Sequence, residues 1–258
     1  MPQTLDAAAV RTWCALALDA LGRAREEIDA INVYPVADGD TGTNLYLTVE
    51  SATRAVEAVF DGHATAGPAS RPTLPDAVRA MAHGALIGAR GNSGTILAQL
   101  LRGMAEVLTA PTGVSDDAEL LRQGLRRAVA SAYEGVARPV EGTVLTVATA
   151  AAEAASRTPG DVATVARAAD EAARTALAVT PGQLDVLGRA GVVDAGGLGL
   201  VEVLGALARA LSGTPAGRAP ARGGRRPAPP RSGSRPRGPW RRKAATPSPR
   251  PAPAPPSR

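Results

Sequence analysis

The chain has 258 residues, 45% of them hydrophobic, which is enough apolar material for a substantial core. Its formal net charge of +5 hides two unlike parts, because residues 213–258 contain eleven Arg, one Lys and no acidic residue, which leaves −7 for residues 1–212. The one lysine, Lys243, lies in that basic segment. Residues 1–212 therefore cannot form a phosphate loop ending in Gly-Lys-Ser/Thr, and they hold no kinase-type strand lysine or Schiff-base lysine.

Residues 1–212 predict an all-α domain. Apolar residues recur at three- and four-residue spacing, and no run of alternating β-branched residues is long enough for a strand. Pro75 and Asp76 suit the first turn of a helix that begins near Leu74, and Ser115 is a candidate N-cap. We expect an antiparallel bundle of eight helices, at residues 5–28, 43–60, 74–88, 93–108, 115–136, 143–156, 161–178 and 197–211.

The segment 213–258 has a different composition. It holds thirteen of the 22 prolines and shows no apolar periodicity, which predicts a disordered tail. The tail is either a genuine appendage or the product of a reading-frame shift in a GC-rich gene. Its charge of +12 supports an alternative hypothesis in which the chain binds nucleic acid or another anionic surface, although only Trp240 could stack on a base there.

The cellular compartment is predicted from three features. Cys14 is the only cysteine, so the chain forms no internal disulfide, and the N-terminus lacks a basic region followed by an apolar stretch. The most apolar late segment, residues 191–211, is interrupted by Asp194, Glu202 and Arg209. We expect a cytoplasmic protein without a membrane span.

The most informative motif is residues 32–44, Asn-Val-Tyr-Pro-Val-Ala-Asp-Gly-Asp-Thr-Gly-Thr-Asn. Asp38 and Asp40, two residues apart, converge only in an irregular loop, which the neighbouring glycines permit. Two such carboxylates suit Mg²⁺, which prefers oxygen ligands, and Thr43 and Asn44 follow where a helix N-terminus leaves amides free for an anion. The plain alternative is a solvated turn with Thr43 as an ordinary N-cap.

Residues 88–94, Gly-Ala-Arg-Gly-Asn-Ser-Gly, form a second glycine-rich connection between helices. Ser93 and Gly94 would present amides and a hydroxyl at a helix start, as in a phosphate cradle, and Arg90 is the nearest cation. An ordinary interhelical turn with a solvated arginine is the alternative.

Two weaker motifs, residues 141–143 (Glu-Gly-Thr) and 193–197 (Val-Asp-Ala-Gly-Gly), each precede a helix and could be simple caps. Their value is positional. In an antiparallel bundle the connections after the first, third, fifth and seventh helices meet at one end, so all four motifs would share that end. His63 and His83 are expected to be structural or solvated, and no hydrolase triad or zinc-ligand spacing is present.

The four motifs, in this order, resemble the DhaL (DAK2) kinase domain, and most closely the one at the N-terminus of bacterial fatty acid kinase. The resemblance covers residues 5–212 and implies an eight-helix barrel that binds ATP at one end through two Mg²⁺ ions. Asp38 and Asp40 would hold the metals and serve catalysis, and Asn32 stands nearest to a third metal ligand of the dihydroxyacetone (glycerone) kinase branch. The implied nucleotide contacts are Thr41, Gly42, Thr43, Asn44, Ser93, Gly94, Thr143, Asp194 and Gly196.

The resemblance also implies a function. Such a domain transfers the γ-phosphoryl group of ATP to an acceptor held by a partner, either a fatty acid carboxylate on a fatty-acid-binding carrier protein or dihydroxyacetone on its own binding subunit. The Thr-Gly-Thr-Asn sequence at residues 41–44 favours the fatty acid type. Because fatty acid kinase continues into further domains, a domain that binds nucleotide but is catalytically incomplete is the alternative. A homodimer is left open.

Overall fold

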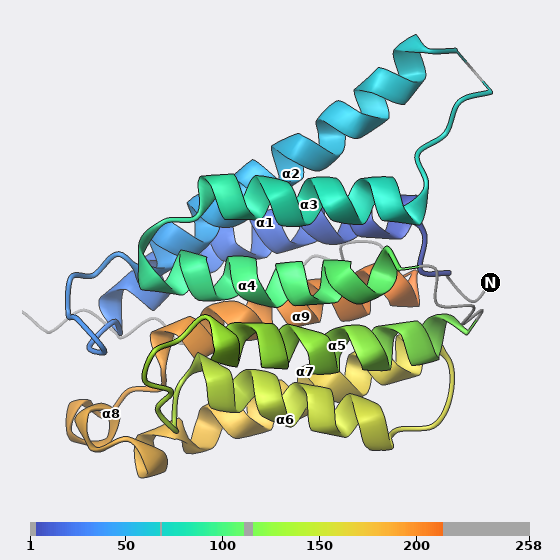
Figure 1. The fold of residues 1–258 in the computed structure, drawn as a ribbon. Coiled ribbons are helices and arrows are strands. Elements are labelled where there is room, and N and C mark those ends of the chain that lie inside the picture. The colour runs from blue at the N-terminus through green and yellow to red at the C-terminus, as the bar shows by residue number, and fades with distance from the viewer. Residues whose placement is uncertain (1–3, 68, 111–115, 214–258) are drawn as a thin grey trace, which may run out of the picture. The chain divides into compact units, whose positions relative to one another are not determined.

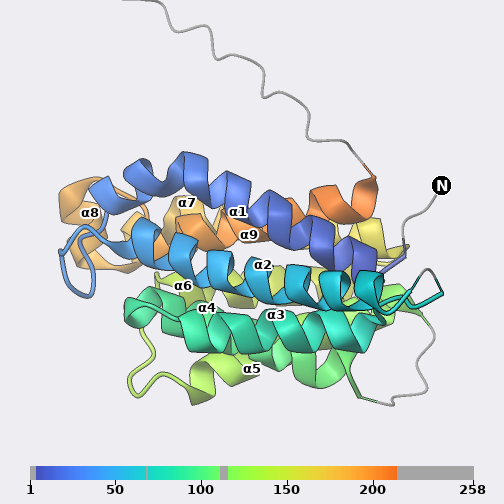
Figure 2. The same ribbon diagram turned by 90° about the horizontal axis from the view of Figure 1, so that it is seen from above.

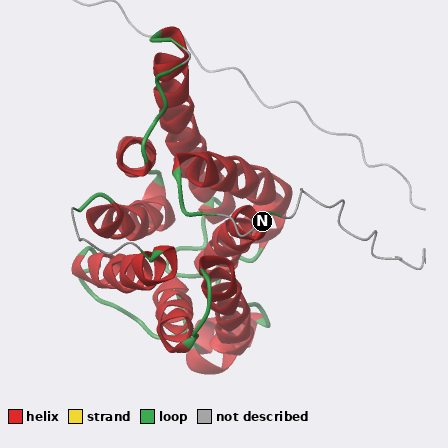
Figure 3. Cartoon of the chain, turned by 90° about the vertical axis from the view of Figure 1, so that its right-hand side faces the viewer, coloured by secondary structure: helices red, strands yellow, loops and turns green. Residues whose placement is uncertain are grey.

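The computed structural model describes residues 4–67, 69–110 and 116–213, and every regular element in them is a helix (Figure 1; Figure 3). The predicted all-α fold is confirmed. The predicted N-cap Ser115 and the predicted disordered tail, beyond Gly213, lie outside the described residues. The helices are α1 Ala7–Ala30, α2 Thr41–Thr65, α3 Leu74–Gly88, α4 Gly91–Leu108, α5 Asp117–Glu134, α6 Val144–Arg157, α7 Val162–Gln183, α8 Asp185–Ala190 and α9 Ala195–Ser212.

The described residues form nine helices rather than eight, because a short one, α8, lies in the segment predicted as a loop. α7 runs five residues past its predicted end at Ala178, with Pro181 in its last turn, and extended backbone at Leu184 separates it from α8. Leu187 is buried and anchors α8. Six residues hold less than two turns of apolar periodicity, which is too little to predict a helix.

The helix starts follow from short polar side chains that accept a backbone amide. Thr73 and Asp76 form a reciprocal capping box at α3, which explains why this helix begins where the sequence predicts. Side-chain caps at other helices come from Asp6, Asp116, Thr143, Asp161 and Asp194.

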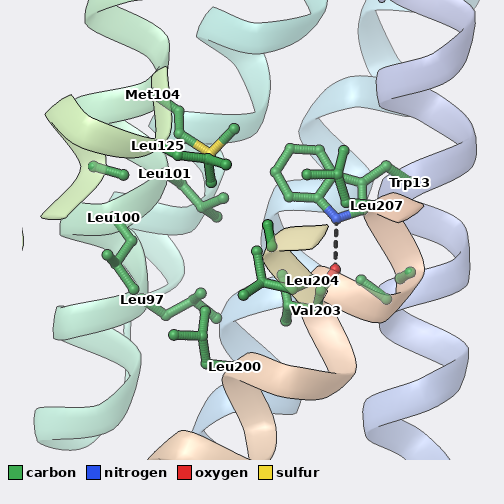
Figure 4. Close-up of a cluster of buried hydrophobic side chains, with 14 of the residues drawn as sticks. Trp13, Leu97, Leu100, Leu101, Met104, Leu125, Leu200, Val203, Leu204 and Leu207 are labelled. Carbon is green, nitrogen blue, oxygen red and sulfur yellow. Dashed lines mark hydrogen bonds between the residues drawn. The ribbon is translucent and has the colours of Figure 1, made fainter. Parts of the chain in front are cut away.

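Successive long helices run in opposite directions across the bundle, and α9 returns to lie against α1, α6 and α7 (Figure 1; Figure 2). Trp13 of α1 donates its indole N–H to the backbone oxygen of Val203 on α9 at 2.9 Å (Figure 4). The space between these helices and α4 is filled by leucines and Met104, which leave a void of about 30 Å³. The interior of the bundle is therefore filled by side chains.

Helix α9 is the one helix in the described part of the chain with the length and composition to cross a membrane. It is a core helix here, because 72% of it is buried inside the bundle.

The last part of α2 diverges from the bundle (Figure 1). In its middle part α2 touches α3 closely, because a Cβ at Gly84 would lie 2.7 Å from the Cβ of Ala55. Farther along, the two helices leave an open groove of about 680 Å³ that both histidines line. His63 is bonded to Ser70 and His83 is exposed.

Candidate functional site

A pocket of about 500 Å³ lies at one end of the bundle. We call this end of the bundle the mouth. The connections that follow α1, α3, α5 and α7–α8 all meet there, at the left of Figure 1, as the antiparallel order predicts. Nine of the twelve predicted site residues line this pocket. They are Asn32, Asp38, Asp40, Thr41, Asn44, Ser93, Thr143, Asp194 and Gly196.

The pocket is lined by the first turns of four helices, α2, α4, α6 and α9. A helix N-terminus carries amides without intrahelical partners and a partial positive charge. At α4 the N-cap residue is Arg90, whose side chain makes no capping bond, so the first-turn amides of this helix keep their hydrogen-bonding capacity. The mouth therefore favours an anion with several oxygen atoms.

The carboxylate loop between α1 and α2 forms one wall. Asn32 is buried and donates from Nδ2 to Asp38 Oδ1 at 2.7 Å, while its own Oδ1 is buried without a hydrogen-bond partner. Asp40 occupies the N-cap position of α2, yet its side chain makes no capping bond. Two carboxylates and an unpaired amide oxygen thus meet here. No group of three or more His, Cys, Asp or Glu suited to a metal exists in the described residues.

Two of the predicted contacts, Gly42 and Thr43, are directed toward α1 rather than the pocket. A Cβ on Gly42 would overlap the backbone oxygen of Arg25, so only glycine lets α2 start this close to α1. The Thr43 amide and hydroxyl donate to the two carboxylate oxygens of Asp29, at 3.0 and 2.8 Å. Asp29 lies three residues before the motif and carries no sequence signal of this role.

The α3–α4 connection forms a second wall. Gly91 has φ +58°, and its α-carbon lies against the Asn44 side chain. Ser93 lines the pocket, whereas Gly94 packs against the Thr48 hydroxyl of α2 and does not reach it. Gly94 therefore joins two helices.

Asp194 connects two further helix starts. Its carboxylate accepts the Gly197 amide of α9 at 2.7 Å and the Val144 amide of α6. The side chain is almost fully buried, and burial raises its pKa to about 6, although the two amides act in the opposite direction. Its own amide donates to the Thr180 hydroxyl of α7 at 3.1 Å. Asp194 thereby fixes α6, α7 and α9 together at the mouth.

The remaining wall combines a cation with apolar side chains. Arg90, the cation that the sequence favours, is exposed and does not line the pocket. Arg138, in the α5–α6 connection, is the one basic side chain among the described residues that line it. No motif marked this arginine. Apolar residues from α4, the same connection and the first turn of α6 complete the wall, namely Ile96, Val136, Ala137, Val140 and Leu145.

A model of the DAK2 domain family matches residues 35–209, from within the carboxylate loop to the last helix. The chain belongs to the DAK2 domain family. The predicted resemblance is thereby confirmed, and the chain is a kinase-related domain.

The chain is also similar to two curated sequences and shares its fold with solved structures. Uncharacterized proteins of Staphylococcus aureus strains USA300 and NCTC 8325 are each 38% identical over 189 residues, covering 72% of this chain and 32% of theirs. Dihydroxyacetone kinase from C. freundii, solved with AMP-PNP and Mg²⁺, shares the fold with a TM-score of 0.55 and 18% identity, over 78% of this chain and 33% of that one. Its native form gives a TM-score of 0.51. This DAK2 domain spans about a third of the length of these proteins.

Proposed function

We propose that this DAK2 domain, residues 1–212, binds ATP with Mg²⁺ and transfers the γ-phosphoryl group to an acceptor that a partner protein presents. The observation that carries the proposal is one pocket in which the carboxylate loop faces the first turns of four helices. The acidic side chains would repel the same phosphate groups that the helix N-termini attract. A metal ion between the carboxylates and the phosphates reconciles the two.

The residues present fit Mg²⁺. Asp38 and Asp40 offer carboxylates that cap no helix, and the orphaned Asn32 Oδ1 is a buried acceptor that a cation would satisfy. The family resemblance implies two ions. When bound, the metal supplies charge neutralisation as phosphoryl transfer proceeds, which suits a domain without lysine.

The other pocket residues would divide the nucleotide between them. We assign the phosphates to the first turns of α2 and α4, through Thr41, Asn44 and Ser93, with Arg138 as the cation that faces them. Thr143, Asp194 and Gly196 lie at the starts of α6 and α9 and would bind the remaining polar groups of the nucleotide. The apolar side chains that line the pocket beside Arg138 suit a nucleobase. Gly42, Thr43 and Gly94 support this surface from behind.

The distribution of exposed apolar residues supports an acceptor that a protein presents. All six large hydrophobic side chains that the described residues leave exposed lie in the mouth loops or within two helical turns of them. They are Val36, Leu47, Leu86, Ile87, Tyr133 and Val179. This gathering at one end of the bundle supports a protein interaction surface around the pocket. A fatty acid carboxylate on a carrier protein is our first choice of acceptor, because of the Thr-Gly-Thr-Asn sequence, and dihydroxyacetone on its subunit is the second.

Nucleotide binding is tested by the melting temperature of the purified chain. ATP with Mg²⁺ is expected to raise it, because a ligand at about 100 times its Kd stabilises the native state by about 2.7 kcal/mol. Asp38→Ala combined with Asp40→Ala should remove this shift. A wild-type protein without a shift, or a double variant that retains it, would show that the site is wrongly assigned.

Transfer is tested separately, with ATP and either a fatty-acid-loaded carrier protein or dihydroxyacetone with its binding subunit. Since the chain spans about a third of its relatives, a domain that binds nucleotide but transfers nothing is the second candidate function. Binding without transfer to either acceptor would favour that second candidate.

A further inference from the structure

Asp29 caps a helix to which it does not belong. It lies in the last turn of α1, half-buried, and its two carboxylate oxygens accept the amide and the hydroxyl of Thr43. Thr43 is the third residue of α2, so its amide is one of the donors that an isolated helix leaves unpaired. Asp29 therefore performs for α2 the role that an N-cap side chain usually performs.

The N-cap residue of α2 is Asp40, and among the described residues it is the one N-cap aspartate whose side chain makes no capping bond. An N-cap aspartate accepts either the amide two residues further on, as Asp116 does from Ala118, or the amide three residues further on. The described residues contain three bonds of the second kind, at 2.8, 2.8 and 2.7 Å, made by Asp6, Asp161 and Asp194. The corresponding donor for Asp40 is the Thr43 amide, and Asp29 already occupies it.

Glycine at position 42 makes this arrangement accessible. A Cβ there would lie 3.0 Å from Asp29 Oδ1, tighter than nearly all real contacts, and would also overlap the backbone of α1. The absence of a side chain therefore lets the carboxylate of α1 reach the first turn of α2. Helix α2 therefore receives its cap from α1 and not from the carboxylate loop.

We propose that Asp29 is a positioning residue, which keeps the Asp40 carboxylate available for Mg²⁺ by occupying the amide that Asp40 would otherwise cap. The inference rests on the proposed function, since it needs Asp40 as a metal ligand. Without Asp29, the Asp40 side chain would turn back to the Thr43 amide and bind the cation more weakly. Mutation of an outer-shell carboxylate that orients a metal ligand typically lowers the metal affinity by about 10- to 100-fold.

The test measures binding of Mn²⁺, as a spectroscopic substitute for Mg²⁺, by electron paramagnetic resonance in the presence of AMP-PNP. Asp29→Ala should lower the Mn²⁺ affinity by about tenfold or more. Asp29→Asn keeps an oxygen for the Thr43 amide and should recover most of the affinity. The matched control is Asp161→Ala, which removes the same kind of cap from α7 at the other end of the bundle. It should lower the melting temperature and leave Mn²⁺ binding unchanged.

A double-mutant cycle separates positioning from direct coordination. If Asp29 acts through Asp40, then Asp29→Ala should have little further effect on Mn²⁺ affinity in an Asp40→Ala background. An equal loss in both backgrounds, or unchanged affinity in Asp29→Ala, would overturn the inference. If Asp29→Ala does not fold, Thr43→Val takes its place in the cycle, because it removes only the hydroxyl bond to Asp29. It is expected to lower the Mn²⁺ affinity by a smaller factor. An unchanged Mn²⁺ affinity in Thr43→Val would then overturn the inference. Failure of the wild-type chain to bind Mn²⁺ with AMP-PNP would instead reject the proposed function.

Discussion

The α-carbon of Gly91 lies directly against the side-chain amide of Asn44, so that a Cβ at position 91 would overlap Asn44 Nδ2. The same residue has φ +58°, a conformation that favours glycine. Gly91 begins α4 and Asn44 lies in the first turn of α2, and both line the pocket. The contact sets the spacing of the two helix starts to which we assign the phosphates.

Replacement of this glycine should therefore affect both stability and binding. Gly91→Ala is expected to lower the free energy of unfolding by about 1–2 kcal/mol, because alanine is strained at positive φ. It should also weaken ATP binding, since the new Cβ displaces Asn44. Urea unfolding and isothermal titration of ATP with Mg²⁺ measure the two effects.

The matched control for that substitution is Gly62→Ala. Gly62 lies inside α2, and a Cβ there meets nothing within 4 Å. Alanine should stabilise the protein by about 0.5–1 kcal/mol and leave ATP affinity unchanged. Equal ATP affinities in the wild type and Gly91→Ala would show that the contact with Asn44 does not shape the site.

The sequence predicted most of the fold because the relevant signals are local. Apolar periodicity located eight of the nine helices in the described residues, and Pro75 and Asp76 placed the start of α3. Antiparallel order then brought four distant motifs to one mouth. What could not be predicted depends on side chains that reach between elements. Asp29 is one residue of a charged helix end, and nothing in its neighbourhood indicates that it caps α2.

The choice of cation shows the same limit. Arg90 stands inside a motif and was favoured for that reason, whereas Arg138 stands outside every motif. Position within a motif does not determine the direction of a side chain at a turn. The three-dimensional structure brings Arg138 of the α5–α6 connection to the pocket and leaves Arg90 of the α3–α4 connection outside it.

Arg138→Ala is expected to weaken the binding of ATP more than that of AMP. A hydrogen bond to a charged group contributes about 1.5–3 kcal/mol, so the ATP affinity should fall by roughly tenfold or more. AMP lacks the β- and γ-phosphates and should bind with nearly unchanged affinity. Arg138→Lys should recover part of the loss, and Arg90→Ala should alter neither affinity. Equal losses for ATP and AMP would place Arg138 beside the nucleoside or the α-phosphate, the parts that both ligands share.

Ile87 tests the interaction surface around the mouth. This side chain is 68% exposed in the last turn of α3, beside the α3–α4 connection. Ile87→Ser should leave ATP affinity unchanged and raise the KM for the carrier-bound acceptor by roughly tenfold, because burial of a large aliphatic side chain contributes about 1.5–3 kcal/mol. The control is Ala64→Ser, an exposed position near the far end of α2. Unchanged transfer kinetics in Ile87→Ser would exclude this part of the mouth from the interface.

Asp194 predicts a pH dependence of stability with a definite sign. Its pKa of about 6 in the native state exceeds the usual value near 3.9, so between about pH 4 and pH 6 the native state binds more protons than the unfolded state. The free energy of unfolding should therefore fall as the pH rises through this window and level off above it. Asp194→Asn, which cannot ionise, lacks this contribution. Urea unfolding of both proteins at several pH values measures the difference between them, which should shift against the wild type by about 1.4 kcal/mol for each unit by which the pKa is raised. A difference that is independent of pH, or that shifts in favour of the wild type as the pH rises, would show that the buried carboxylate is ionised throughout.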